Sequence, residues 1–165
     1  MRLIRVLAVF AAGLVVGTLV TRPSSAQNEN TGLRLNHVGI AVKDYQQSMD
    51  YYTKVMGFRV AFALKGPDGK PGTTYLQINR DTFLELAQAS GKVVPGTITH
   101  IGIQTENADA TVARLRELGA KVTDARVSAN SGSKLANVTD PDGIRMELNE
   151  LIPGSLTRKA VESWK

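Results

Sequence analysis

Two stretches of the chain show the same alternation of hydrophobic and polar positions. The first reads Asn36-His37-Val38-Gly39-Ile40-Ala41-Val42, and the second reads Thr99-His100-Ile101-Gly102-Ile103-Gln104-Thr105. A period of two predicts β-strands, because successive side chains of a strand point to opposite faces of a sheet. In each strand the bulky aliphatic side chains share one face, and the histidine and the glycine share the other.

The repeat extends well beyond these strands. A segment predicted to be helical follows each strand and ends at a glycine, Gly57 in the first copy and Gly119 in the second. Later in each copy a glutamate lies between apolar residues, Glu85 in the first and Glu147 in the second. Equivalent residues are 62 or 63 positions apart, which indicates one module of about 60 residues present twice.

The same patterns predict the other elements of a single domain over residues 33–151. Module one (33–90) is expected to contain strands near 33–42, 58–64, 73–79 and 82–87 and a helix at 45–55, capped by Asp44. Module two (96–151) is expected to contain a helix at 108–118 and strands near 121–123, 134–139 and 144–150. We expect the helical spacing of two sets of residues to place them in the core: Met49, Tyr52 and Met56 in the first helix, and Val112, Leu115 and Leu118 in the second.

A tail of residues 152–165 follows the second module. Its spacing predicts a short helix with Leu156, Val161 and Trp164 facing inward. Nothing in the tail suggests chemistry.

The candidate chemistry lies in the repeat itself. The chain has two histidines, and both occupy the equivalent position of the two modules. A lone histidine or glutamate in a strand is usually structural, but here the alternation places four metal-binding side chains on the face opposite the aliphatic one. These are His37, Glu85, His100 and Glu147. We therefore predict that they share one metal site.

Two imidazoles and two carboxylates suit one divalent ion, such as Zn²⁺, Ni²⁺, Co²⁺, Mn²⁺ or Fe²⁺. A six-coordinate ion with four protein ligands keeps two positions for water or substrate oxygens, which is typical of a catalytic site. Such a site favours removal of a proton next to a carbonyl by a carboxylate, while the ion stabilises the charge that develops on the oxygens. Four cations are candidates for a substrate pocket: Arg34, Arg59, Lys134 and Arg145.

The two modules resemble the vicinal oxygen chelate superfamily, which includes glyoxalase I, bleomycin resistance proteins and extradiol dioxygenases. The resemblance spans Leu33 to Leu151 and rests on the two histidine strands, on Met56-Gly57-Phe58 at the helix end, and on Asp140-Pro141-Asp142-Gly143 before Met146-Glu147-Leu148. It implies an α+β fold of two tandem βαβββ modules that form a curved mixed sheet around a metal cavity, with His37, Glu85, His100 and Glu147 as ligands.

The ligand order His, Glu, His, Glu is similar to that of glyoxalase I, the lactoylglutathione lyase branch. That similarity implies a lyase or isomerase acting by proton transfer on an α-hydroxycarbonyl small molecule of the hemithioacetal type, with Glu147 as catalytic base and Glu85 as the alternative. Two other functions stay open. One is an iron-dependent dioxygenase, which usually has a histidine where Glu85 lies, and the other is a non-catalytic binding or resistance protein, which generally lacks the metal ligands.

The N-terminal residues differ in composition from the repeat. Arg2 and Arg5 precede an apolar run over 6–20, and small residues at 24–26 suit cleavage, so residues 1–26 have the pattern of a secretory signal peptide. An uncleaved membrane anchor is the alternative, since a spanning helix needs about 20 apolar residues. We expect a periplasmic or secreted protein that meets the membrane only through this segment.

Residues 27–32 are polar and are expected to be a linker. Without residues 1–26 the chain loses three arginines and no acid, so its formal net charge falls from +5 to +2. With no basic cluster and no interleaved aromatic residues, the sequence predicts no nucleic-acid partner. The chain has no cysteine, so neither a disulfide nor a lipidated cysteine stabilises or anchors it. The resemblance also allows a homodimer, since modules of that superfamily pair either within one chain or between two chains.

Overall fold

The structure is a computed structural model, and it describes residues 31–66, 69 and 71–165. The predicted signal segment, residues 1–26, lies outside the described residues, as does most of the predicted linker. Residues 32–165 form a compact unit of their own. Within the described part of the chain, no helix is both long enough and apolar enough to cross a membrane.

One mixed sheet contains all nine strands of the described residues. Its order is β2-β3-β4-β1-β5-β9-β8-β6, with β7 paired to β8. The strands are β1 (Arg34–Val42), β2 (Arg59–Lys65), β3 (Pro71–Gln77), β4 (Phe83–Gln88), β5 (Thr97–Gln104), β6 (Lys121–Val122), β7 (Arg126–Val127), β8 (Lys134–Thr139) and β9 (Arg145–Glu150). The helical elements are α2 (Tyr45–Asp50), the π-helical turn η2 (Tyr51–Val55), α3 (Ala108–Glu117) and α4 (Leu156–Glu162). The predicted α+β fold with a mixed sheet is confirmed.

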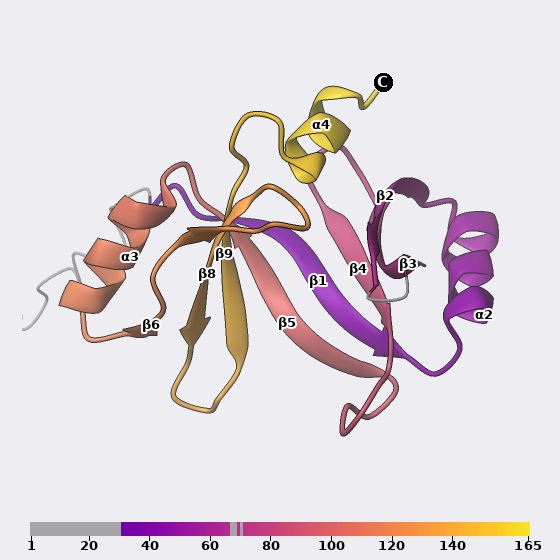
Figure 1. Ribbon diagram of the computed structural model, residues 1–165, viewed down its shortest axis with the longest axis horizontal. Coiled ribbons are helices and arrows are strands. Elements are labelled where there is room, and N and C mark those ends of the chain that lie inside the picture. The colour runs from indigo at the N-terminus through magenta and orange to yellow at the C-terminus, as the bar shows by residue number, and fades with distance from the viewer. Residues whose placement is uncertain (1–30, 67–68, 70) are drawn as a thin grey trace, which may run out of the picture. The chain divides into compact units, whose positions relative to one another are not determined.

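The two modules meet through their first strands, β1 and β5, which pair antiparallel at the middle of the sheet (Figure 1). Within each module the first and last strands pair in parallel, β1 with β4 and β5 with β9. The modules therefore pair within one chain in this structure. Figure 1 also shows α2 beside the strands of module one and α3 beside those of module two.

Equivalent residues begin and end the two module helices. Asp44 and Asn107 are the N-caps, and their side chains accept hydrogen bonds at 2.9 Å from the backbone N–H of Gln47 and Ala110 respectively. Gly57 and Gly119, which follow the helical segments, have φ angles of +72° and +85°, a backbone conformation that glycine adopts without strain. Both predicted helix boundaries are confirmed to within two residues.

The predicted core positions of the helices are only partly correct. After Asp50 the chain continues as the π-turn η2, which has more residues per turn than an α-helix and shifts the later side chains around the axis. Met49 and Tyr52 are half-buried, but Met56 is 49% exposed, and neither α2 nor η2 contains a buried residue. Leu118 is likewise 73% exposed, because α3 ends at Glu117 and Leu118 is its C-cap.

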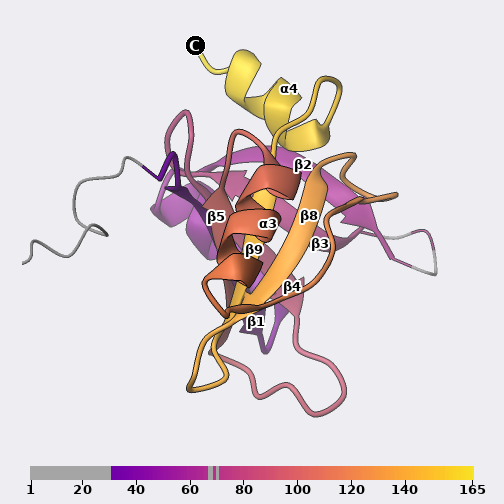
Figure 2. The same ribbon diagram turned by 90° about the vertical axis from the view of Figure 1, so that its left-hand side faces the viewer.

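Module two has a core built around its own helix. Val112 of α3 packs with Ala136 and Val138 of β8 and with Leu148 of β9, and Leu115 is partly buried against this cluster. Figure 2 shows α3 lying in front of β8 and β9. The core predictions for Val112 and Leu115 are therefore confirmed.

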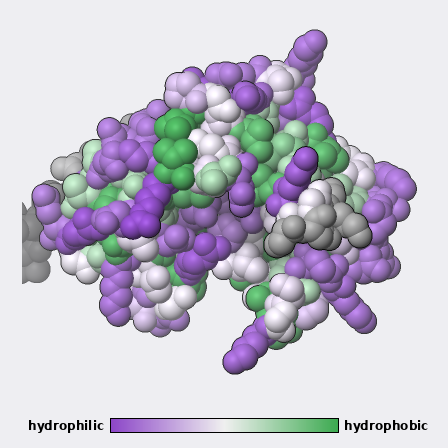
Figure 3. Space-filling model, viewed as in Figure 1, coloured by the Kyte–Doolittle hydropathy of each residue, from purple (hydrophilic) through white to green (hydrophobic). Residues whose placement is uncertain are grey.

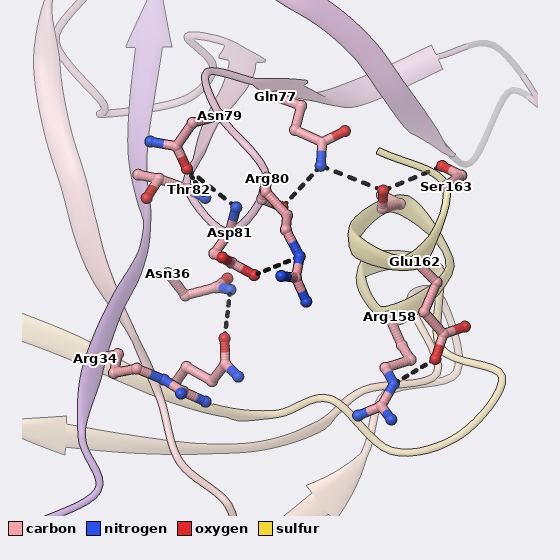
Figure 4. A network of polar contacts seen from close by, with 12 residues as sticks. Arg34, Asn36, Gln77, Asn79, Arg80, Asp81, Thr82, Arg158, Glu162 and Ser163 are labelled. Carbon is pink, nitrogen blue, oxygen red and sulfur yellow. Dashed lines mark hydrogen bonds and ion pairs between the residues drawn. The ribbon is translucent and has the colours of Figure 1, made fainter. Parts of the chain in front are cut away.

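Module one packs instead against the C-terminal helix. Ala160 and Val161 of α4 join Tyr75 and Phe83 in its core cluster. The buried Gln77 donates hydrogen bonds to the carbonyl oxygens of Arg80 (2.9 Å) and Ala160 (3.3 Å), which connect α4 to β3 (Figure 4). The predicted tail helix exists, and its Leu156 and Val161 are half-buried, but Trp164 lies beyond its end, 36% exposed.

Large hydrophobic side chains that remain exposed are spread over several elements. They include Val55, Val60, Val94, Ile98 and Leu118. On the face seen in Figure 3, hydrophobic residues form separate patches among hydrophilic ones. Scattered exposure of this kind is ordinary for a folded domain and does not indicate a particular partner.

Candidate metal centre

Each histidine of the repeat lies opposite a glycine of the other module. In the pairing of β1 with β5, His37 is opposite Gly102 and His100 is opposite Gly39. A Cβ atom on Gly102 would lie 2.1 Å from ring atoms of His37, and one on Gly39 would lie 2.3 Å from the ring of His100. The glycines therefore leave the space that the imidazole rings fill, and this explains the His-x-Gly spacing. His37 is fully buried and His100 is 4% exposed.

The structure brings all four predicted site residues together. The Nε2 atoms of His37 and His100 are 2.9 Å apart. Oε2 of Glu85 lies 3.4 Å from His37 Nε2 and 3.3 Å from His100 Nε2, and Oε1 of Glu147 lies 3.7 Å from His37 Nε2. Ligand atoms of His37, His100 and Glu147 all lie within 4.8 Å of one another.

The cluster fits a divalent metal site. Both imidazoles direct Nε2 toward the carboxylates, while Nδ1 contacts a neighbouring oxygen: Asn36 Oδ1 at 2.8 Å for His37 and Thr99 Oγ1 at 3.0 Å for His100. Metal-binding histidines are commonly oriented in this way by a hydrogen bond at the other ring nitrogen. Imidazole nitrogens and carboxylate oxygens suit the borderline divalent ions named above.

The strands around the histidines are less regular than simple alternation predicts. The register between β1 and β5 shifts between Leu35 and His37 and again between Gly39 and Ile40. The first shift makes Asn36 an extra residue of β1, and the second makes Thr99 an extra residue of β5. Such bulges re-aim side chains, and here they bring Asn36 and Thr99 beside the imidazoles. Neither contact was predicted from the sequence. The available signal was that Asn36 and Thr99 each directly precede a histidine.

The two carboxylates have different surroundings. The Tyr75 hydroxyl donates a hydrogen bond to Oε2 of Glu85 at 2.5 Å. Burial raises the pKa of Glu85, but the hydrogen bonds from His100 and Tyr75 and the nearby imidazoles lower it, and the net pKa is below the ordinary value. Burial next to this carboxylate raises the pKa of Tyr75. Glu85 is therefore held as an anion.

Within the part of the chain that the structure describes, no hydroxyl group donates a hydrogen bond to Glu147 as Tyr75 does to Glu85. Its neighbour across the strand pair is Asn137, which accepts a hydrogen bond from Arg145 Nη1 at 2.9 Å. Arg145 Nη1 lies 3.9 Å from Glu147 Oε2. Burial and the negative charge of Glu85 raise the pKa of Glu147, although His100 and Arg145 oppose this shift. Glu147 therefore takes up a proton more readily than Glu85.

The predicted pocket cations are dispersed. Arg145 reaches the cluster, but Arg59 contacts Gln77 and α4, and Lys134 pairs with Asp109. Arg34 lines a separate cavity of about 410 Å³ together with two arginines that the sequence did not single out, Arg80 and Arg158. These two arginines and Arg34 are seen around Asn36 in Figure 4.

Comparison with known proteins places the chain among relatives of two kinds. A family model described as the glyoxalase/bleomycin resistance protein/dioxygenase superfamily matches residues 34–148. Lactoylglutathione lyase of Escherichia coli O157:H7 is 32% identical over 125 residues, which are 72% of this chain and 93% of that protein. Mitochondrial methylmalonyl-CoA epimerase of Bos taurus is 25% identical over 90% of this chain and 98% of its own.

The solved structures give the same fold. The crystal structure of methylmalonyl-CoA epimerase from Mycobacterium tuberculosis matches with a TM-score of 0.63 and 20% sequence identity, over 76% of this chain and 93% of that one.

Proposed function

The chain belongs to the glyoxalase/bleomycin resistance protein/dioxygenase superfamily, and from this premise we propose that it is a divalent-metal-dependent enzyme that transfers a proton at a carbon next to a carbonyl. His37, Glu85, His100 and Glu147 would hold one metal ion, which supplies Lewis acidity to the substrate oxygens. The protein side chains around that ion would carry out the proton transfer.

The observation that carries this proposal is the unequal environment of the two carboxylates. Environments that separate the pKa values of two neighbouring acids indicate which of them exchanges protons. The hydrogen bond from Tyr75 holds Glu85 in its anionic form, whereas the pKa of Glu147 is raised and no hydroxyl of the described residues donates to it. We therefore assign Glu147 as the catalytic base and Glu85 as a fixed ligand.

The specific reaction that we propose is of the glyoxalase I type. In a hemithioacetal, Glu147 would take the proton from the carbon that bears the hydroxyl and the sulfur. It would return that proton to the neighbouring carbonyl carbon, while the hydroxyl proton passes to the former carbonyl oxygen, and the product is an α-hydroxy thioester with the same atoms as the substrate. The 32% identity to a lactoylglutathione lyase over most of its length supports this reading.

Epimerisation next to a thioester is the second candidate. The match to bovine methylmalonyl-CoA epimerase covers nearly the whole of both chains, at lower identity. Epimerisation also begins with removal of a proton next to a carbonyl, but the proton returns to the opposite face of the same carbon. Two carboxylates at one centre suit that reaction as well.

The test uses residues 27–165, which include the whole compact unit of 32–165. The protein is stripped with a chelator and reloaded in turn with Zn²⁺, Ni²⁺, Co²⁺, Mn²⁺ or Fe²⁺, and bound metal is measured by elemental analysis. Each form is assayed with methylglyoxal plus glutathione, with methylglyoxal plus another small thiol, and with methylmalonyl-CoA. Metal-dependent formation of the α-hydroxy thioester supports the first proposal.

Other outcomes separate the alternatives. Turnover of methylmalonyl-CoA alone selects the epimerase. Oxygen uptake with catechols by the Fe²⁺ form selects a dioxygenase. Small-molecule binding that survives both Glu85→Ala and His100→Ala, without turnover on any substrate, selects a binding protein. A chain that binds no divalent ion after reloading rejects the metal-dependent proposal.

We also propose that residues 1–26 direct export and are removed. An exported enzyme is separated from hemithioacetals formed by cytoplasmic glutathione, which is why the assay includes a second thiol. Cell fractionation and N-terminal sequencing of the exported protein test this point. A chain that stays in the cytoplasm with Met1 intact rejects it, and a membrane-bound chain with Met1 intact selects the uncleaved anchor. Sedimentation of the same protein shows whether it forms a homodimer.

A further inference from the structure

Asn36 is a fully buried polar side chain next to His37. As the extra residue of the β1 bulge, it lies with its Oδ1 atom 2.8 Å from His37 Nδ1. Buried polar side chains are retained when their hydrogen bonds are made. The hydrogen bonds of the Asn36 amide therefore indicate its role beside His37.

Two further contacts set the orientation of the Asn36 amide. Its Nδ2 donates to Gln104 Oε1 at 3.4 Å (Figure 4), and its Oδ1 accepts from Asn149 Nδ2 at 3.5 Å. The carbonyl oxygen consequently faces His37, and an amide oxygen can only accept hydrogen bonds. A neutral His37 must then carry its proton on Nδ1. This leaves a lone pair on Nε2, directed toward the other members of the cluster.

Module two uses a different group at the equivalent position. Thr99, the extra residue of the β5 bulge, has its Oγ1 atom 3.0 Å from His100 Nδ1. A hydroxyl can donate or accept a hydrogen bond, so it does not restrict the tautomer of His100. Both tautomers of His100 can therefore be accommodated.

We propose that Asn36 is a positioning residue that holds His37 in the metal-binding tautomer, with the proton on Nδ1, whereas Thr99 leaves the tautomer of His100 unrestricted. The inference rests on the proposed metal site but does not depend on the reaction or its substrate.

The test is NMR of ¹⁵N-labelled histidine rings in residues 27–165, at about pH 8, which is above the ordinary histidine pKa of about 6.5. In chelator-treated protein we expect the proton of His37 on Nδ1. After addition of Zn²⁺ we expect it to stay on Nδ1. His37→Gln and His100→Gln assign the signals.

Two variants measure the contribution of each neighbour. Asn36→Leu has a similar volume but no acceptor, and we expect His37 to lose its single tautomer and the affinity for Zn²⁺ to fall about 10- to 100-fold. Thr99→Val is the matched control in module two, and we expect it to leave the His37 tautomer unchanged. Asn36→Asp keeps an acceptor oxygen, and we expect it to keep the proton of His37 on Nδ1.

Three results would overturn the proposal. These are a proton on Nε2 of His37 in the chelator-treated parent, Zn²⁺ binding by Asn36→Leu with the parent affinity, and loss of the His37 tautomer in Asn36→Asp. If Asn36→Leu does not fold, the parent and Asn36→Asp spectra decide. Because these spectra need no turnover, failure of the proposed reaction and failure of this proposal are distinguishable.

Discussion

The two modules hold the same pair of proposed metal ligands, a histidine and a glutamate, in different ways. In module one the cross-strand partner of Glu85 is Tyr75, whose hydroxyl bonds to the carboxylate. In module two the cross-strand partner of Glu147 is Asn137, which bonds to Arg145 instead. Tyr75 and Asn137 are 62 residues apart and are therefore equivalent positions of the repeat. The two modules therefore match at the site residues but differ at the cross-strand neighbours of the carboxylates.

The two modules also differ in which helix packs into their cores. Module two packs Val112 of its own helix α3 into its core, whereas module one has no buried residue in α2 or η2 and uses Ala160 of α4. The C-terminal helix thus stabilises the half of the sheet that carries Tyr75 and Glu85. Together these differences suggest that module one supplies the fixed part of the site and module two supplies the part that exchanges protons.

Replacing each glutamate separately with glutamine is the most severe test of this division of roles between the two modules. We expect Glu147→Gln to lower kcat per bound metal about 10²- to 10⁴-fold, the range that general base catalysis typically contributes. Glu85→Gln should lower metal affinity, with a smaller loss of kcat per bound metal. The measurement is turnover normalised to metal content, and equal losses in both variants would contradict the assignment.

The pH dependence of stability tests the buried imidazole of module one. Burial lowers the pKa of His37 to about 4, with Glu85 opposing the shift and His100 and Arg145 adding to it. The unfolded chain keeps a value near about 6.5. Between these values the unfolded chain binds a proton that the folded chain does not, so stability falls as the pH decreases from about 6.5 to about 4.

The expected loss of stability over this range approaches about 3 kcal/mol. Urea unfolding of chelator-treated protein at about pH 7.5 and about pH 4.5 measures it. His37→Gln lacks the titrating group and should lose less stability over the same interval. A variant that loses as much as the parent would show that other groups are responsible.

Tyr75→Phe makes the carboxylate of module one resemble that of module two. It removes a hydrogen bond to a buried charged group, and we expect the free energy of unfolding to fall by about 1.5–3 kcal/mol. The pKa of Glu85 should rise at the same time. Asn137→Ala, at the equivalent position, removes a contact to Arg145 and should cost about 1 kcal/mol or less. Equal costs in urea unfolding would remove the proposed difference between the modules.

Substitution of the glycines opposite the histidines has the smallest expected effect and tests equivalent positions in both modules. An added Cβ at Gly102 would displace the fully buried His37, and one at Gly39 would displace His100. We expect both alanine variants to lose metal and about 1–3 kcal/mol of stability, as overpacked cores do. Gly102→Ala should be the more costly, since His37 has no exposed surface to move toward. Either variant binding metal with the parent affinity would show that the rings can shift at little cost.

Much of the fold followed from local patterns. Alternation identified the four strands that carry the site residues, and Asp44, Gly57 and Gly119 predicted where helical segments begin and end. These signals work because capping and strand alternation depend on a few neighbouring residues. Met56 and Leu118 were placed wrongly in the core, because the π-turn and the helix ends change the direction of side chains without a clear local signal.

The sequence alone determined which side chains meet. The repeat put His37, Glu85, His100 and Glu147 at equivalent positions, and strand alternation directed them to one face. The tertiary structure decided how each one is held. The contacts of Asn36, Thr99 and Tyr75 depend on bulges and cross-strand register between segments far apart in the chain. Register is set by the packing of whole strands rather than by adjacent residues, so the protonation of the site could not be predicted before the strands were paired.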